Sequence, residues 1–237
     1  MNSLSIIIPA YNEEKTIIKV LESIRDSKFD NTKVKYQIIV VNDGSKDKTL
    51  DLLENNKNLY DVLINNPKNM GKGFSVKEAL KKSICEYIIF QDADLEYNPE
   101  DYKKFFLLSS KFSPDLIIGS RFNYDKYIRS HNYLNSLGNL IITKFFNILF
   151  NTTFNDIYSC YVCFKNKIIK PEDLKTYGFE QQAEILWKIV TTTKVFFEVP
   201  INYNGRSATE GKKIKFYHLF LVLAEIMKGR ILSLIKK

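Results

Sequence analysis

Short apolar runs alternate with segments of helical periodicity along the first half of this 237-residue chain. The apolar runs have the length of strands, and we expect strands at residues 4–9, 36–41, 62–64, 87–90 and 116–118. Between them, apolar residues recur every three or four positions, which predicts helices at residues 14–27, 47–56, 71–83 and 99–112. This alternation predicts right-handed βαβ units and therefore a single Rossmann-like α/β domain with a mostly parallel central sheet flanked by helices.

The run Tyr87–Phe90 ends in three carboxylates at alternating positions, Asp92, Asp94 and Glu96. In an extended segment alternate side chains point the same way, so we expect the three acids to converge just past the strand. Clustered carboxylates repel one another unless a cation lies among them, and Mg²⁺ or Mn²⁺ is the natural candidate for oxygen ligands. Taken alone, these acids fit a solvated turn equally well, because aspartate is common in turns.

Polar residues also follow the other predicted strands. Tyr11 and Glu13 come after the first strand, Asp43 after the second and Arg121 after the fifth. In a parallel sheet, ligands bind beyond the carboxyl ends of the strands. These residues and the acidic segment should therefore share one rim, which favours a binding site over a solvated turn.

The formal net charge of +8 and the pI of about 9.1 favour an anionic partner. Charge alone suggests nucleic acid, but the basic residues are dispersed and no basic and aromatic stacking module is present, so we expect no nucleic-acid binding. Cys160 and Cys163 form a C-x-x-C, yet too few further ligands exist for zinc, and a structural role is favoured. Sparse cysteines and an N-terminus without the pattern of a signal peptide predict a cytoplasmic protein.

The chain resembles a known family at four ordered blocks: IIIPAYNEE, VVNDGSKDKT, NMGKGFSVKEAL and FQDADLEYNP. In this order and spacing they resemble family 2 glycosyltransferases of the GT-A fold. The later blocks GSRF, FEQQAEIL and EVPINYNGRSATEGKKI are similar to the polyprenyl-phosphate (dolichyl-phosphate) sugar synthases. The resemblance implies a catalytic domain at residues 1–215 and leaves residues 216–237 as a C-terminal amphipathic helix suited to membrane association.

The resemblance also implies roles for individual residues. The positions that match donor-binding positions are Pro9, Ala10, Tyr11, Glu13 and Asp43 for the base and ribose, Asp92 and Ala93 for the ribose and phosphate region, Asp94 at the diphosphate, and Arg206 and Lys212 on the loop that closes over the leaving diphosphate. Asp94 with Glu96 would hold the divalent metal, and Arg121 with Arg129 would receive the acceptor phosphate. The residues expected to act in catalysis are Asp92, Asp94, Arg121, Arg206 and Lys212. The family often has two aspartates after the second strand, where this chain has Asn42 and Asp43.

The chemistry of sugar transfer explains these residue types. A metal with arginine and lysine neutralises the charge that develops on a leaving nucleoside diphosphate. An acceptor phosphate is already ionised and needs positioning by arginine, whereas an acceptor hydroxyl needs a carboxylate base. Glu180 and Glu184 are candidates for that base, and for Glu180 helix capping or packing is an equal alternative. His131 could touch the acceptor, although a structural or surface position is favoured.

The expected reaction is therefore transfer from a GDP-mannose or UDP-glucose type donor to a polyprenyl or dolichyl phosphate. Two alternatives stay open. One is a glycosyltransferase that acts on a glycan hydroxyl in cell-surface polysaccharide synthesis, and the other is an inactive homologue that only binds the donor.

Two long apolar segments bear on the acceptor, Tyr133–Phe150 and Phe216–Ile235. Charged residues interrupt the second, and neither has the roughly 20 clean apolar residues of a membrane span. Packing in the core is the default for such helices. The alternative is an interfacial helix whose lysines and arginines meet anionic lipid. With the net positive charge and a lipid-phosphate acceptor, this alternative predicts peripheral attachment to the cytoplasmic face of a membrane.

Overall fold

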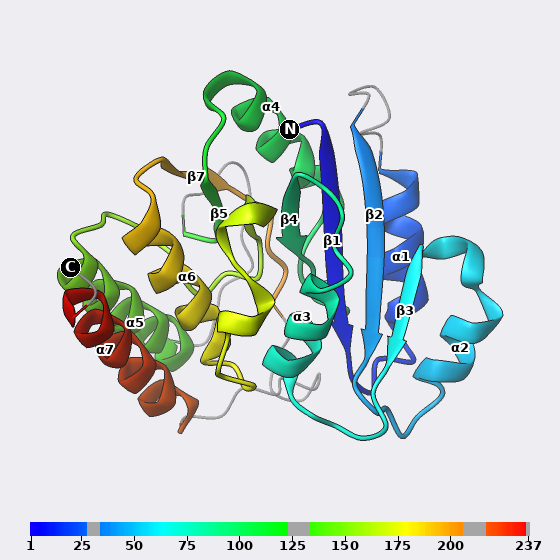
Figure 1. The fold of residues 1–237 in the computed structure, drawn as a ribbon. Coiled ribbons are helices and arrows are strands. Elements are labelled where there is room, and N and C mark those ends of the chain that lie inside the picture. The colour runs from blue at the N-terminus through cyan, green and yellow to red at the C-terminus, as the bar shows by residue number, and fades with distance from the viewer. Residues whose placement is uncertain (28–33, 123–132, 206–216, 236–237) are drawn as a thin grey trace.

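The structure of the protein is a computed structural model that describes residues 1–27, 34–122, 133–205 and 217–235. Its centre is a twisted sheet of seven strands (Figure 1). The strands are β1 (Ser3–Ala10), β2 (Lys35–Asn42), β3 (Val62–Asn65), β4 (Tyr87–Phe90), β5 (Leu116–Ser120), β6 (Val162–Lys165) and β7 (Phe196–Pro200). The five strands expected from the sequence are all present.

The sheet has the strand order β3-β2-β1-β4-β6-β5-β7. β1 is parallel to both β2 and β4, and β5 is parallel to β7, whereas β6 runs antiparallel between β4 and β5. The mostly parallel sheet is confirmed. The strand order reverses at β1, which has β2 on one side and β4 on the other, and ligands of open α/β sheets bind at such a switch point.

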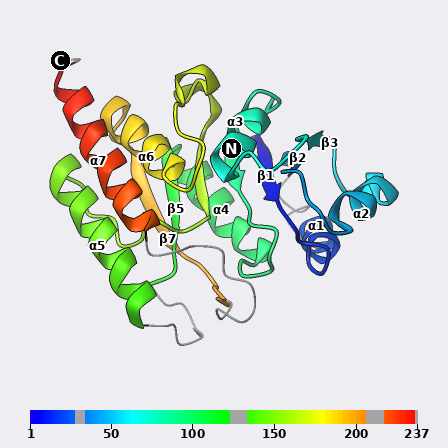
Figure 2. The same ribbon diagram turned by 90° about the horizontal axis from the view of Figure 1, so that it is seen from below.

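Helices cover both faces of the sheet. They are α1 (Ile17–Asp26), α2 (Thr49–Asn55), α3 (Lys72–Leu80), α4 (Tyr102–Phe112), α5 (Tyr133–Phe150), α6 (Gln181–Thr192) and α7 (His218–Ile235), with the short 3₁₀ helices η2 (Lys57–Leu59), η3 (Pro99–Asp101), η4 (Asn166–Ile168) and η5 (Pro171–Asp173). Seen from below, α1 and α3 lie on opposite sides of the N-terminal strands (Figure 2). This double cover explains why β4 is buried along its whole length and reads as an uninterrupted apolar run.

Strands β6 and β7 were not expected. β6 interrupts the strand–helix alternation on which the prediction rested, because an antiparallel strand needs no crossover helix. The helix expected from Pro99 begins instead as the 3₁₀ turn η3, which Asn98 caps by accepting a hydrogen bond from the Glu100 amide. The helices α1 and α3 begin later than expected, at Ile17 and Lys72.

Helices α5, α6 and α7 pack together beside the β5–β7 end of the sheet, with α5 and α7 side by side in both ribbon views (Figures 1 and 2). Helix α7 approaches α6 closely at Gly229, where a Cβ atom would lie 2.4 Å from the indole of Trp187. The indole Nε1–H donates a hydrogen bond of 3.1 Å to Glu225 of α7. Within the described part of the chain, no helix combines the length and apolarity that a membrane crossing requires.

Candidate functional site

A cavity of about 410 Å³ opens where the carboxyl ends of β1, β2, β4 and β5 face helices α3 and α6. The rim expected from the sequence is therefore present. Ten residues singled out from the sequence line it: Pro9, Ala10, Tyr11, Glu13, Asp43, Asp92, Ala93, Asp94, Glu96 and Arg121. Three others that were singled out, Arg129, Arg206 and Lys212, lie outside the described residues, as does His131.

Hydrogen bonds join the loop after β1 to the loop after β2. Asn12 adopts a positive φ of 52°, which turns the chain sharply after the strand. Its backbone N–H donates to the Ser45 hydroxyl at 3.0 Å, and its side-chain oxygen accepts from the Lys46 amide at 2.8 Å. This interlock fixes the segment that carries Tyr11 and Glu13 on the cavity wall.

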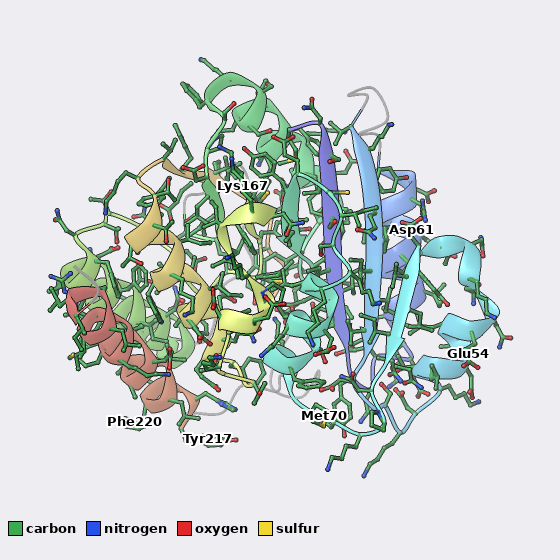
Figure 3. The ribbon with its side chains drawn as sticks, viewed as in Figure 1. Glu54, Asp61, Met70, Lys167, Tyr217 and Phe220 are labelled. Carbon is green, nitrogen blue, oxygen red and sulfur yellow. The ribbon has the colours of Figure 1, made fainter. Side chains whose placement is uncertain are left out.

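Asp43 organises the loop that leads into α3. Its carboxylate accepts hydrogen bonds from the Asn66 side chain at 2.8 Å, the Met70 amide at 3.0 Å and the Gly71 amide at 2.9 Å. The loop around Met70 lies at the lower end of the sheet, just before α3 (Figure 3). Asp43 is only 3% exposed, and its carboxylate holds this loop in place.

A buried glutamine holds the end of β4. The side-chain oxygen of Gln91 accepts hydrogen bonds from the hydroxyls of Tyr102 and Tyr161, both at 2.7 Å. Its amide nitrogen donates to the backbone carbonyl of Asp92 at 3.0 Å. A fully satisfied buried network of this kind is rigid. It therefore fixes the point from which the acidic segment leaves the sheet.

The acidic segment is a turn, and the extended geometry expected from its alternating acids is wrong. Leu95 takes a positive φ of 62°, which is uncommon for a residue with a branched side chain. The Asp94 carboxylate accepts the Glu96 amide at 3.2 Å, and the Glu96 carboxylate accepts the Tyr203 hydroxyl at 2.7 Å. The acids all line the cavity but do not form one cluster. Among the described residues, no three His, Cys, Asp or Glu side chains are grouped to hold a metal ion.

Asp92 forms an ion pair with Lys72, whose Nζ lies 2.6 Å from Oδ1. Burial alone would raise the pKa of Asp92, but the Lys72 ammonium outweighs it and holds that pKa below its usual value. The neighbouring Cys160 thiol also lowers the pKa of Asp92, and burial keeps the pKa of this thiol well above its usual value. The sequence alone indicates a helix start at Lys72 and a structural role for Cys160. In the structure both residues line the cavity.

Arg121 also lines the cavity and forms a bidentate ion pair with Asp156, at 2.7 Å from Nε and 2.8 Å from Nη2. Asp156 is fully buried. Asn139 of α5 accepts from Arg121 at 3.4 Å and donates to Asp156 at 3.1 Å, and the guanidinium lies 5.1 Å from the centre of the Tyr203 ring. Burial would lower the pKa of Arg121, but the Asp156 carboxylate outweighs it and keeps the guanidinium charged.

The two glutamates considered as catalytic bases are engaged elsewhere. The carboxylate of Glu184 is buried and accepts hydrogen bonds from the amides of Lys175 and Thr176 and from the Thr176 hydroxyl. The Glu180 carboxylate accepts the Gly178 amide at 3.0 Å. Neither glutamate lines the cavity. Glu184 therefore holds the segment before α6 in place, and Glu180 holds the turn that follows this segment.

A doubly wound sheet whose switch-point cavity is lined by an acidic turn and a partly buried arginine is suited to binding a nucleotide-type ligand. The comparison with family models agrees, since the model of glycosyl transferase family 2 matches residues 5–170. The chain belongs to this family. It is a nucleotide-sugar-dependent glycosyltransferase, as the sequence predicted.

Two relatives of this chain are named as transferases that use dolichyl phosphate. The UDP-N-acetylglucosamine–dolichyl-phosphate N-acetylglucosaminyltransferase of Methanococcus voltae is 27% identical, over 96% of this chain and 97% of that protein. A dolichyl-phosphate beta-glucosyltransferase of Trichomonas vaginalis is 32% identical, over 54% of this chain but only 42% of that protein. The resemblance to polyprenyl-phosphate sugar synthases is thus confirmed.

A solved structure confirms the fold. The glucosyl-3-phosphoglycerate synthase of Mycobacterium tuberculosis, in complex with Mn²⁺, UDP and phosphoglyceric acid, matches with a TM-score of 0.70. The match covers 98% of this chain and 78% of that chain at 14% identity. At this identity the likeness concerns the fold alone.

Proposed function

We propose that the protein transfers a sugar from a nucleoside diphosphate sugar to a polyprenyl phosphate at a membrane surface, with a divalent cation at the donor. An acceptor phosphate oxygen attacks C1 of the sugar, the bond between C1 and the diphosphate breaks, and the nucleoside diphosphate leaves. UDP-sugars are the first donors to test, because a relative that aligns over 97% of its own length carries a UDP-sugar in its name. GDP-mannose is the second class.

The observation that carries this proposal is the position of Arg121. Its guanidinium faces the cavity, and through Asn139 it is tied to α5. The outward side of α5 and its neighbour α7 is strongly apolar. A phosphate that reaches Arg121 along α5 can therefore keep its hydrocarbon chain in an apolar environment while its charge meets a guanidinium.

We call this outward side the α5–α7 face. Its exposed apolar residues are Leu137, Leu140, Ile141 and Ile148 of α5 and Phe220, Leu221, Met227, Ile231, Leu232, Leu234 and Ile235 of α7, with Tyr217 just before α7. Tyr217 and Phe220 project outward from the start of α7 (Figure 3). The exposed charges here are cationic, at Lys144 and Lys228, and the one acid of the two helices, Glu225, is buried. Lys228 is paired with Glu225 at 2.9 Å, and an apolar surface whose exposed charged side chains are lysines suits an anionic lipid surface.

The acidic turn fits a divalent cation by its chemistry. Asp94 and Glu96 line the cavity and offer the oxygen ligands that Mg²⁺ and Mn²⁺ prefer, and oxygens of the donor diphosphate would complete the coordination. The cation would act as a Lewis acid on the leaving diphosphate. We assign Asp94 and Glu96 to the metal, Asp92 and Ala93 to the ribose and phosphate, and Pro9, Ala10, Tyr11, Glu13 and Asp43 to the base and ribose. We assign Arg206 and Lys212 to the donor diphosphate. We assign Arg121 and Arg129 to the acceptor phosphate.

A donor screen tests the proposal. UDP- and GDP-sugars are incubated with polyprenyl phosphate and, in parallel, with oligosaccharide acceptors, and the products are read by mass. We expect a polyprenyl-phosphate sugar with one donor class, and loss of that product on addition of EDTA. Sugar transfer only to an oligosaccharide hydroxyl would contradict the acceptor assignment, and donor binding without transfer to any acceptor would favour an inactive homologue.

The α5–α7 face makes a separate prediction about lipid binding. Phe220 and Ile231 are 61% and 52% exposed, so replacing both by glutamate removes apolar contact and adds charge that anionic lipid repels. We expect the fraction of protein that sediments with anionic liposomes at low salt to fall at least tenfold. The matched control is Ile84→Glu, since Ile84 is 83% exposed but lies before β4, away from this face. Equal binding by wild type and by the double variant would rule the face out, as would wild-type protein that does not sediment with liposomes.

A further inference from the structure

Lys72 occupies a position that a helix by itself does not favour. It is the first residue of α3, follows Gly71 with a φ of 99°, and no acidic residue stands in the first turn. The amino end of a helix carries partial positive charge, so a lysine here is electrostatically unfavourable. Residues that break a local rule are commonly functional.

The conformation around Gly71 directs the start of α3 into the cavity. A Cβ atom at Gly71 would lie 2.5 Å from the carbonyl oxygen of Tyr177, so only glycine fits. The Phe74 amide donates to the same carbonyl at 3.1 Å, which ties the first turn of α3 to the segment before α6. The backbone therefore holds Lys72 at the cavity wall, where its ammonium meets Asp92.

Lys72 and Arg121 are cations that line the cavity, and they differ in the carboxylate with which each is paired. Among the described residues that line the cavity, the cations are Lys72 and Arg121, whereas five carboxylates line it. The charge of Arg121 is balanced by Asp156, which lies outside the cavity lining. Lys72 is instead paired with Asp92, a carboxylate of the acidic turn itself.

We propose that Lys72 is a built-in countercation of the donor site. Its ammonium neutralises Asp92 in the empty site and moves to the donor diphosphate when the donor arrives with its divalent cation. The inference rests on the proposed donor site but not on the acceptor. A divalent cation near Asp94 repels the ammonium, while the diphosphate adds anionic oxygens within the same cavity. The four-carbon stem of lysine lets the charge move without a backbone change.

Two affinities, measured without acceptor, test this role. Lys72→Met should shift them in opposite directions. For Lys72→Met, we expect Mn²⁺ alone, followed by its electron paramagnetic resonance signal, to bind at least fivefold more tightly, because the competing cation is gone. We expect UDP or GDP, whichever the wild type binds, to bind at least tenfold more weakly at saturating Mn²⁺, because the diphosphate loses a charged partner. Lys72→Arg, which keeps the charge, should stay within threefold of wild type in Mn²⁺ affinity.

Two controls make the test specific. Lys81→Met removes a lysine at the other end of α3, where its partner Glu78 does not line the cavity, and should change neither affinity. In an Asp92→Asn background the ammonium has lost its neutralising carboxylate, so Lys72→Met should raise the Mn²⁺ affinity at least as much as it does in the wild type. Unchanged Mn²⁺ affinity in a folded Lys72→Met variant would overturn the proposal, as would a gain that disappears with Asp92→Asn. Failure to transfer sugar to polyprenyl phosphate would leave these binding shifts unaffected and would bear only on the proposed acceptor.

Discussion

Replacing Asp94 by asparagine is expected to lower the turnover number for sugar transfer by roughly 100-fold or more. Removing one group that stabilises developing charge in an active site typically lowers turnover by this factor. The substitution keeps the size of the side chain and the oxygen that accepts the Glu96 amide at 3.2 Å, so the turn should survive. What it removes is the negative charge that we assign to the divalent cation. The folded variant should also bind Mn²⁺ more weakly in the presence of nucleotide.

The measurement is steady-state transfer at several Mn²⁺ concentrations, with protein integrity followed by thermal unfolding. Asp51→Asn is the control, since Asp51 is an exposed aspartate on α2 that does not line the cavity. Its turnover should equal that of wild type. Full activity of the wild type in EDTA, together with an active Asp94→Asn variant, would refute the metal assignment.

The second large effect concerns Arg121 and separates its structural role from its acceptor role. Asp156 is fully buried and depends on Arg121 for its counterion. Arg121→Met should therefore lower the free energy of unfolding by about 3 kcal/mol or more, the usual cost of leaving a buried charge unpaired. Adding Asp156→Asn removes that charge and keeps an oxygen for the backbone N–H of residue 121, which now donates to Asp156 at 3.0 Å.

We expect the double variant to regain most of the lost stability in urea unfolding and to bind nucleotide like wild type. It should still fail to transfer sugar to polyprenyl phosphate, because no guanidinium is present to receive the acceptor. Lys165→Met provides a matched control, since it breaks the more exposed ion pair with Asp115 and should cost no more than about 1 kcal/mol. If the double variant recovers transfer along with stability, Arg121 serves the fold alone.

The rim of the sheet could be predicted from the sequence because its signals are local. Each parallel strand is a short apolar run, and each functional cluster follows its strand within a few residues, as Asp43 follows β2 and Arg121 follows β5. Ligand position then follows from the topology of parallel sheets. This is why residues far apart in the chain could be assigned to one cavity before their contacts were known.

The partners of these residues could not be predicted in the same way. Asp156 lies 35 positions from Arg121, and Tyr203 lies 107 positions from Glu96, so no spacing connects them. The geometry of the acidic turn depends on the left-handed conformation of Leu95, for which the sequence offers no glycine or asparagine as a signal. The partner of Lys72 could not be predicted either, because Asp92 lies 20 positions away.

The contact between α7 and Trp187 has a practical consequence. The chain contains one tryptophan, so its fluorescence comes from a single known place. That indole is buried against the backbone of Gly229 and bonded to Glu225, and both partners belong to α7. The emission wavelength of the unmodified protein therefore reports whether this helix stays docked on α6 when lipid is added. An optical probe of the helix that we propose to face lipid is thus already present in the native chain, without any label.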